Sequence, residues 1–286
     1  MIALLLAVGG VLAMVFQCAL IPHARAQVLN YPTKPVRVVV PYPPGGTTDL
    51  VGRLVAQELG KKLGQNFIVD NRGGASGQIG TDIVAKAAAD GYTLLVGASG
   101  NIMMQSALSP TLPYNVHRDF ETIGNIVNVA NLMVVSPNSR FTSLRNFVEF
   151  AKNSPGKVRY ASGGTGSSGH LAGELLSAIA GIDILHVPYR GGGLSILSVI
   201  SGETDVIFVN LPTALPHTRS GKLRGITVLS TKRATAAPEF PTTGELGMPE
   251  FIITSSTGLL APKDTPPQTI ALLEKSVKSI ADDPRV

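Results

Sequence analysis

Short hydrophobic runs rich in β-branched residues alternate with segments of helical spacing along most of the chain. The run from Val36 to Val40 predicts a strand, and a Pro- and Gly-rich break follows it. Behind the break, Thr47, Thr48 and Asp49 are suitable helix caps. Apolar residues then recur three and four positions apart, which predicts a helix through Leu50, Val51, Leu54, Val55 and Leu59.

This strand, turn and helix unit repeats. Further strands are predicted over residues 67–69, 92–96, 132–135, 158–161, 184–187, 206–209, 223–228 and 258–260, with helical segments between most of them and a last helix over about 267–281. Strands that alternate with helices indicate an α/β fold with parallel sheets covered on both faces. Because the strands are too many for one small sheet, we expect two α/β lobes.

The N-terminus predicts an exported protein. Residues 2–21 are almost wholly apolar, and Ala24-Arg25-Ala26 is a small-x-small cleavage pattern. We therefore expect a signal peptide over 1–26 and a periplasmic mature chain from Gln27. No Lys or Arg precedes the apolar run, so an uncleaved membrane anchor stays an alternative. Cys18 is the single cysteine and lies in this segment, so disulfides, thiolate catalysis and Cys-ligated metals are excluded for the mature chain.

The composition limits the classes of partner that the chain is expected to bind. With 44% hydrophobic and 15% charged residues the chain is globular rather than disordered. The net charge of +5 favours anionic partners, but there is no Lys/Arg run with interleaved aromatics, so no nucleic-acid binding is expected. Trp is absent and aromatics are 5%, which disfavours a site that stacks on sugars or bases.

Three loops share one design, in which a strand is followed by a Gly-rich turn and a helix start. They span residues 43–49, 72–77 and 162–169. Free backbone N–H groups and the positive end of a helix attract an anion, and glycine lets the backbone approach it closely. Ligands of open parallel sheets bind beyond the carboxyl ends of strands, where these loops lie. Three such loops predict a cleft that contacts an anion at several points.

The third loop has a second interpretation. Gly164, Gly166 and Gly169 match G-x-G-x-x-G between a strand and a helix, and Arg190 ends the next strand, where it would read a 2′-phosphate. An NADP-dependent oxidoreductase is therefore the alternative function. The acidic residue usual in dinucleotide sites is missing, and an exported chain seldom holds a nicotinamide cofactor.

Candidate chemistry is otherwise sparse. The five histidines show no metal-ligand spacing, and no G-x-S-x-G occurs, so we predict no metal, no cofactor and no catalysis. His170 has two interpretations, a ligand contact or general base, and a helix-start residue that bonds locally. Asp49 is either a helix cap or a contact to a ligand amine or water, and these do not exclude each other.

Motifs along the whole mature chain carry a family resemblance. They are Tyr31-Pro32-Thr33-Lys34-Pro35, Val40-Pro41-Tyr42-Pro43-Pro44-Gly45-Gly46, Val69-Asp70-Asn71-Arg72-Gly73-Gly74, Asp90-Gly91-Tyr92, Leu112-Pro113-Tyr114, Tyr160-Ala161-Ser162, His186-Val187-Pro188-Tyr189-Arg190 and Gly221-Lys222-Leu223-Arg224. In this order they resemble the Bug-type receptors, the extracytoplasmic solute-binding proteins of tripartite tricarboxylate transporters.

The resemblance implies a two-lobed periplasmic-binding-protein fold of the two-crossover type, each lobe a mostly parallel sheet flanked by helices. Lobe 1 would comprise residues 27–130 and 223–286, and lobe 2 residues 131–222. It implies a monomeric receptor that takes a small carboxylate to membrane transporter subunits. The expected ligand-binding residues, counting the anion loops, are Tyr42, Pro44, Gly45, Gly46, Thr47, Asp49, Ala98, Ser99, Ser162, Gly164, Thr165, His170, Tyr189, Arg190 and Asn210.

Two departures from the family pattern bear on function. The family usually has Phe where this chain has Tyr42, so an extra hydroxyl is available for ligand choice. The chain also stops at Val286, where relatives continue, so we expect lobe 1 to be truncated and to expose apolar surface. A ligand-free interaction module is therefore a third, non-catalytic alternative.

Overall fold

The computed structural model describes residues 30–283. The predicted signal peptide, residues 1–26, and Cys18 lie outside the described residues. From Tyr31 onward the chain forms one compact unit. None of the helices in this described part is long and apolar enough to cross a membrane.

A first group of strands, sheet A, combines parallel and antiparallel pairs. Strand β1 pairs in parallel with β2 and β3, and β9 pairs antiparallel with β3 and with the first part of β4. The strands are β1 (Val36–Val40), β2 (Phe67–Asn71), β3 (Thr93–Ala98), β4 (Phe120–Val135) and β9 (Thr254–Pro262). The helices of this group are α2 (Thr47–Leu63), α3 (Gln78–Ala85), α4 (Gln105–Leu108), α5 (Val116–Asp119) and α10 (Pro267–Ala281), with a 3-10 turn at Ala75–Gly77 and a π-helical turn at Gly100–Met104.

A second group, sheet B, has the same mixture. Strand β5 pairs in parallel with β6 and β7, whereas β7 and β8 pair antiparallel with the last part of β4. The strands are β5 (Arg159–Ser162), β6 (Leu185–Pro188), β7 (Val206–Asn210) and β8 (Arg224–Val228). The helices of this group are α6 (Leu144–Asn153), α7 (Ser168–Ala180), α8 (Gly192–Ile200) and α9 (Leu211–Arg219).

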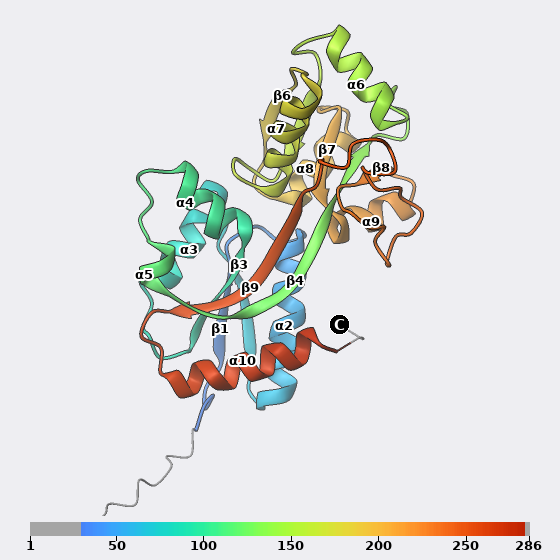
Figure 1. The fold of residues 1–286 in the computed structure, drawn as a ribbon. Coiled ribbons are helices and arrows are strands. Elements are labelled where there is room, and N and C mark those ends of the chain that lie inside the picture. The colour runs from blue at the N-terminus through green and yellow to red at the C-terminus, as the bar shows by residue number, and fades with distance from the viewer. Residues whose placement is uncertain (1–29, 284–286) are drawn as a thin grey trace, which may run out of the picture. The chain divides into compact units, whose positions relative to one another are not determined.

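Strand β4 belongs to both sheets. Ala130 pairs with Thr254 in sheet A, and the next residue, Asn131, pairs with Asn210 in sheet B. Figure 1 shows β4 and β9 running side by side between the two groups of helices. The predicted α/β fold with sheets flanked by helices is confirmed. The lobe boundaries stay a prediction, and β8, which that prediction assigns to lobe 1, pairs instead with β4 in sheet B.

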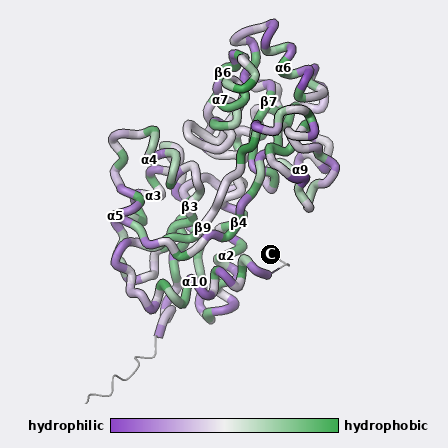
Figure 2. The backbone as a smooth tube through the Cα atoms, viewed as in Figure 1, coloured by the Kyte–Doolittle hydropathy of each residue, from purple (hydrophilic) through white to green (hydrophobic). Residues whose placement is uncertain are grey.

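The alternation of side chains along each strand builds a core on both faces of each sheet. In β1, Val38 and Val40 face α2 and α10, whereas Val39 faces the opposite side with Val84 of α3. In β7, Phe208 packs toward α6 and α7, and its neighbours on the other face pack toward α8 and α9. Figure 2 shows hydrophobic residues gathered along these central strands. Two-sided burial explains why the strands are continuous apolar runs.

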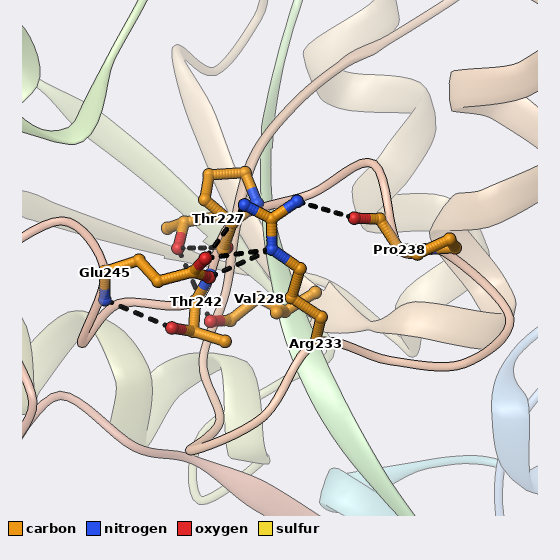
Figure 3. A network of polar contacts seen from close by, with 7 residues as sticks. Thr227, Val228, Arg233, Pro238, Thr242 and Glu245 are labelled. Carbon is orange, nitrogen blue, oxygen red and sulfur yellow. Dashed lines mark hydrogen bonds and ion pairs between the residues drawn. The ribbon is translucent and has the colours of Figure 1, made fainter.

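The segment between β8 and β9 is irregular but well anchored. Arg233 donates to both carboxylate oxygens of Glu245 at 2.9–3.1 Å, and Glu245 also accepts the backbone N–H of Thr242 at 2.7 Å (Figure 3). Thr227 of β8 donates through Oγ1 to the carbonyl of Pro241 at 2.9 Å. These contacts hold the segment against sheet B, which brings the chain back to β9 at a fixed position.

Candidate functional site

A cavity lies between the strand ends of sheet A and those of sheet B. Its empty space is about 610 Å³, open solvent included. Its lining is Tyr42, Pro43, Gly46, Thr47, Thr48, Ala98, Gly100, Gly163, Ser167, Ser168, Gly169, Gly191, Gly192, Phe208, Val209, Asn210, Thr213 and Ser255. We call this the first cavity. Its walls therefore come from both sheets.

Four helices begin at the first cavity. Residues at or next to the starts of α2, α7, α8 and α9 line it, namely Thr47, Ser168, Gly192 and Asn210. The first N–H groups of a helix have no partner inside the helix, and each helix start carries about half a positive charge. No side chain caps α2, α8 or α9, although Pro212 in the first turn of α9 has no N–H to donate. The cavity is thus suited to an anion.

The absence of charge on the lining of the first cavity also favours an anionic ligand. None of the residues that line the first cavity carries a charged side chain. An anion would therefore meet no carboxylate, and its attraction would come from backbone dipoles and hydroxyl groups. Such fixed donors are preorganised, so little reorganisation opposes binding.

Gly46 lies where the two sides of the cavity meet, at ordinary van der Waals distance. A Cβ added at Gly46 would lie 3.8 Å from the backbone nitrogen of Gly192, which belongs to the other side of the cavity. Gly169 is required by packing, because an added Cβ there would lie 2.2 Å from the carbonyl oxygen of Phe208. Gly164 and Gly166 have φ of +122° and +80°, where side chains are disfavoured. Packing and backbone conformation thus account for the G-x-G-x-x-G spacing without a dinucleotide.

Two side-chain hydrogen bonds join the sheet A group to the sheet B group, one of them between residues that line the first cavity. Thr47 and Thr213 have their side-chain oxygens 2.7 Å apart. Gln105 donates through Nε2 to the carbonyl of Thr165 at 2.7 Å, and its Oε1 accepts from Gln78 at 2.9 Å. Gln105 is nearly buried by these contacts. These contacts join the two sides of the first cavity directly.

Asp49 holds the loop before α2. It is 3% exposed, and it accepts the N–H of Gly45 at 3.1 Å and Asn71 Nδ2 at 2.9 Å, with Arg53 at 3.0 Å. Burial raises the pKa of this carboxyl, but the bonds from Arg53, Asn71 and Gly45 outweigh it and the pKa is lowered. Asp49 does not line the cavity, and its oxygens already have partners.

A second cavity adjoins the first. Its empty space is about 570 Å³, open solvent included, and it shares Tyr42, Pro43 and Gly163 with the first cavity. The rest of its lining is Gly74, Ala75, Ser76, Gly77, Gly164, Thr165, Pro188, Tyr189 and Arg190. Burial raises the pKa of Tyr42, so its hydroxyl stays neutral, and this hydroxyl donates to the carbonyl of Ser76 at 3.4 Å.

Two histidines support the third Gly-rich loop from behind. The N–H of Gly166 donates to Nδ1 of His170 at 3.2 Å, so His170 bonds locally. Nε2 of His186 lies 2.7 Å from the hydroxyl of Ser162, which also accepts the N–H of Gly164. Burial lowers the pKa of His170, and burial followed by the charge of His170 lowers that of His186 to about 4. Both rings are neutral near pH 7.

The predicted ligand-binding residues fall into three sets. Those that line the first cavity are Tyr42, Gly46, Thr47, Ala98 and Asn210. Tyr42 also lines the second cavity, together with Gly164, Thr165, Tyr189 and Arg190. Neither lining includes Pro44, Gly45, Asp49, Ser99, Ser162 or His170. Among these, Ser162 is fully buried and Ser99 lies 3.3 Å from Ser255 through their hydroxyls.

Sequence reasoning missed several lining residues. Gly191 and Gly192 follow a predicted strand and precede a helix, which is the same pattern that marks the three loops. Sequence reasoning could therefore have identified them. Thr213 and Ser255 carry no local signal, because they lie inside α9 and β9 and reach the cavity only through the tertiary fold. The described residues contain no group of three or more His, Cys, Asp or Glu that could hold a metal ion.

Known proteins are similar to this chain in sequence and in fold. The family described as "Tripartite tricarboxylate transporter family receptor" matches residues 51–286. BugT of Bordetella pertussis is 39% identical over 249 residues, which cover 87% of this chain and 76% of BugT.

Two solved structures are similar over most of their length. One is R. palustris Rpa4515 with adipate, with a TM-score of 0.85 and 33% identity, covering 90% of this chain and 86% of the other. The second is MatC of Rhodopseudomonas palustris with bound malate, with a TM-score of 0.83 and 31% identity, covering 89% and 86%. The family resemblance of the motifs is thereby confirmed, and the chain belongs to the family of tripartite tricarboxylate transporter receptors.

Proposed function

We propose that this chain is a periplasmic solute receptor that captures a small carboxylate in the first cavity and delivers it to the membrane subunits of a tripartite tricarboxylate-type transporter. The observation that carries the proposal is the convergence of four helix starts on a cavity whose lining has no charged side chain. A carboxylate there replaces water by fixed N–H donors, and charge-assisted hydrogen bonds of this kind are worth about 1.5–3 kcal/mol each.

Closure couples capture to delivery in this proposal. The first cavity takes its walls from both sheets, so a ligand makes all its contacts only in the closed arrangement. A ligand shifts the equilibrium toward closure by its difference in affinity for the closed and open forms. A closed, loaded receptor then differs in surface from an empty one, which lets the membrane subunits distinguish them.

The same proposal covers location, assembly and chemistry. Export through a cleaved signal peptide would place the receptor in the periplasm, where it acts as a monomer. We propose no catalysis. Ser162 and His186 are within hydrogen-bond distance, but Ser162 is 0% exposed and also accepts a backbone N–H, so its hydroxyl is not available as a nucleophile.

Thermal shift and calorimetric titration test this function. Protein purified after expression of the full-length chain is titrated with mono-, di- and tricarboxylates and with NADP. A ligand that binds only the native state raises the melting temperature, so at least one carboxylate should raise it. Micromolar NADP binding without carboxylate binding would instead support the oxidoreductase alternative. No heat with either set would support the ligand-free interaction module.

A further inference from the structure

A buried asparagine stands where β4 passes from sheet A to sheet B. Asn131 is 0% exposed, and both its backbone groups are paired, since its N–H donates to the carbonyl of Ile253 at 3.2 Å and its carbonyl accepts from Leu229 at 2.8 Å. Its side-chain Nδ2 is also buried but has no hydrogen-bond partner within the described residues. A buried polar group costs free energy unless it is paired, so this side chain needs an explanation beyond the stability of the strand.

Asn131 is joined to the first cavity through Ser168. The hydroxyl oxygen of Ser168 lies 3.2 Å from Oδ1 of Asn131 and 3.1 Å from Oδ1 of Asn210. Ser168 and Asn210 both line the first cavity, whereas Asn131 does not. The three side chains therefore form a short network that begins in the buried part of β4 and ends at the surface of the cavity.

Asn210 does not cap the helix that it precedes. It is the N-cap residue of α9, a position where asparagine commonly accepts a backbone N–H of the first turn, but its side chain makes no such bond. Its Oδ1 contacts Ser168 instead, and its Nδ2 has no partner within the described residues. The amide of Asn210 is therefore held by Ser168 at the cavity wall rather than by its own helix.

The hydroxyl of Ser168 has one proton, which fixes the order of the network. It cannot donate to two amide oxygens, so one of the two amides must turn and present its N–H to Ser168. Turning the amide of Asn131 gives its buried Nδ2 a partner, and Ser168 then donates to Oδ1 of Asn210. Turning Asn210 instead would leave both N–H groups of the Asn131 amide unpaired, whereas an unpaired buried oxygen is tolerated more often. The favoured order therefore leaves Nδ2 of Asn210 free as a donor.

From this order we infer that Asn131 is a positioning residue for the ligand, which acts through Ser168 to hold the amide of Asn210 with its N–H groups available to an anion in the first cavity. Hydrogen bonds in a chain polarise one another, so the donor at the cavity end is strengthened by the buried end. The inference rests on the proposed function, since it concerns how the same cavity holds its carboxylate.

A double-mutant cycle tests the network. Calorimetry on the product of the full-length chain measures the affinities of Asn131→Leu, Ser168→Ala and the double variant for butyrate, succinate and citrate. For each ligand that binds the wild type, we expect either single change to lower the affinity by about three- to tenfold and the double change to lower it no further, because residues of one network are not additive. Ser168→Thr keeps the hydroxyl and should retain the affinity within about twofold. If Asn131→Leu does not fold, the smaller change Asn131→Ala takes its place in the cycle.

Ser198→Ala is the matched control for Ser168→Ala. Ser198 is a buried serine of α8 whose hydroxyl bonds to Ser195 and Thr204, and it lies outside both cavity linings. It should leave the affinity unchanged, alone and in combination with Asn131→Leu. Losses that multiply when Asn131→Leu and Ser168→Ala are combined, or an unchanged affinity in Ser168→Ala, overturn the network while the proposed function stands. If no mono-, di- or tricarboxylate binds the wild type, the proposed function and the network both fail.

Discussion

The side-chain oxygens of Thr47 and Thr213 lie 2.7 Å apart and join the start of α2 to α9 across the first cavity. Thr47 is 4% exposed and Thr213 5%, and both line the cavity. One bond therefore links the two sides of the cavity and forms part of the surface that a ligand would touch.

Replacing Thr213 with Val should weaken ligand binding more than folding. Valine keeps the shape but removes the bond to Thr47, and a typical hydrogen bond contributes about 0.5–1.5 kcal/mol. At ~1.4 kcal/mol per tenfold, carboxylate affinity should fall roughly two- to tenfold in calorimetry. Thr218→Val is the control, since Thr218 bonds only within α9, to the carbonyl of Leu215. Equal affinities in both variants would show that the bond does not contribute to closure.

Gly46→Val should crowd the first cavity, because the valine methyl groups reach beyond a Cβ that would itself lie in ordinary contact with Gly192, at 3.8 Å. Gly46 has φ −90° and ψ 168°, an extended conformation that valine adopts without strain, and it faces the nitrogen of Gly192. We expect affinity to fall by about tenfold or more while the ligand-free melting temperature is unchanged. Gly164 is less suitable for this test, because its φ of +122° would strain any side chain.

Gly244→Val is the matched control for Gly46→Val. Its added Cβ would also have its nearest neighbour at 3.8 Å, the Cα of Pro249, and Gly244 is not part of either cavity lining. Unchanged affinity in both variants, or a large drop in the melting temperature of Gly46→Val alone, would mean that Gly46 is a packing residue.

Acidification should destabilise the loop that His186 supports. The pKa of His186 is lowered to about 4 in the folded chain, first by burial and then by His170, with Glu174 opposing. Since the unfolded value is about 6.5, the folded state binds fewer protons between these values, so this contribution to stability is complete above about pH 6.5 and is lost as pH falls toward about 4.

Melting temperatures measured from neutral to mildly acidic pH check this. Wild type should lose more stability over that range than His186→Gln, in which an amide replaces the ring beside Ser162. The rings of His170 and Tyr160 contact the His186 ring, and Glu174 is linked to both of these residues. These three residues are therefore kept unchanged in the His186→Gln variant. Parallel pH curves for the two proteins would contradict the assignment.

Asp49→Asn should destabilise the protein measurably. The amide cannot accept all of the bonds that Gly45, Asn71 and Arg53 donate to the buried carboxylate, and an unsatisfied buried group costs about 1–3 kcal/mol. The melting temperature should fall by roughly 2–4 °C per kcal/mol. Asp282→Asn breaks an exposed pair with Lys278 at the same i, i+4 spacing and should change stability by less than about 0.5 kcal/mol. Similar shifts in both variants would remove the loop-holding role.

The local part of the fold was predictable from sequence, and the long-range part was not. The unit of β1 and α2 has its strand, break and helix in one stretch, so its pattern is complete. The predicted caps Thr47, Thr48 and Asp49 are wrong, because Gly46 is the N-cap and no side chain caps α2. Strand β4 begins at Phe120, but only residues 132–135 were predicted, because Gly124, Asn125 and Asn128 interrupt the hydrophobic pattern. Antiparallel pairing with β9 fixes that part as a strand.

The candidate site divides in the same way. Gly46, Thr47 and Gly164 were found because a Gly-rich turn between a strand and a helix has a local signature. Thr213 was missed because it becomes a cavity residue only when α9 packs opposite α2. His170 had two interpretations in the sequence, and the bond from Gly166 to its Nδ1 supplies the local one.

A crystal structure of the receptor with the tightest-binding carboxylate tests the central claim most directly. We expect a carboxylate group in the first cavity, within hydrogen-bond distance of the backbone N–H groups at the starts of α2 and α8, near Thr47 and Gly192. A ligand bound outside this cavity, or held there without contact to either helix start, would contradict the account.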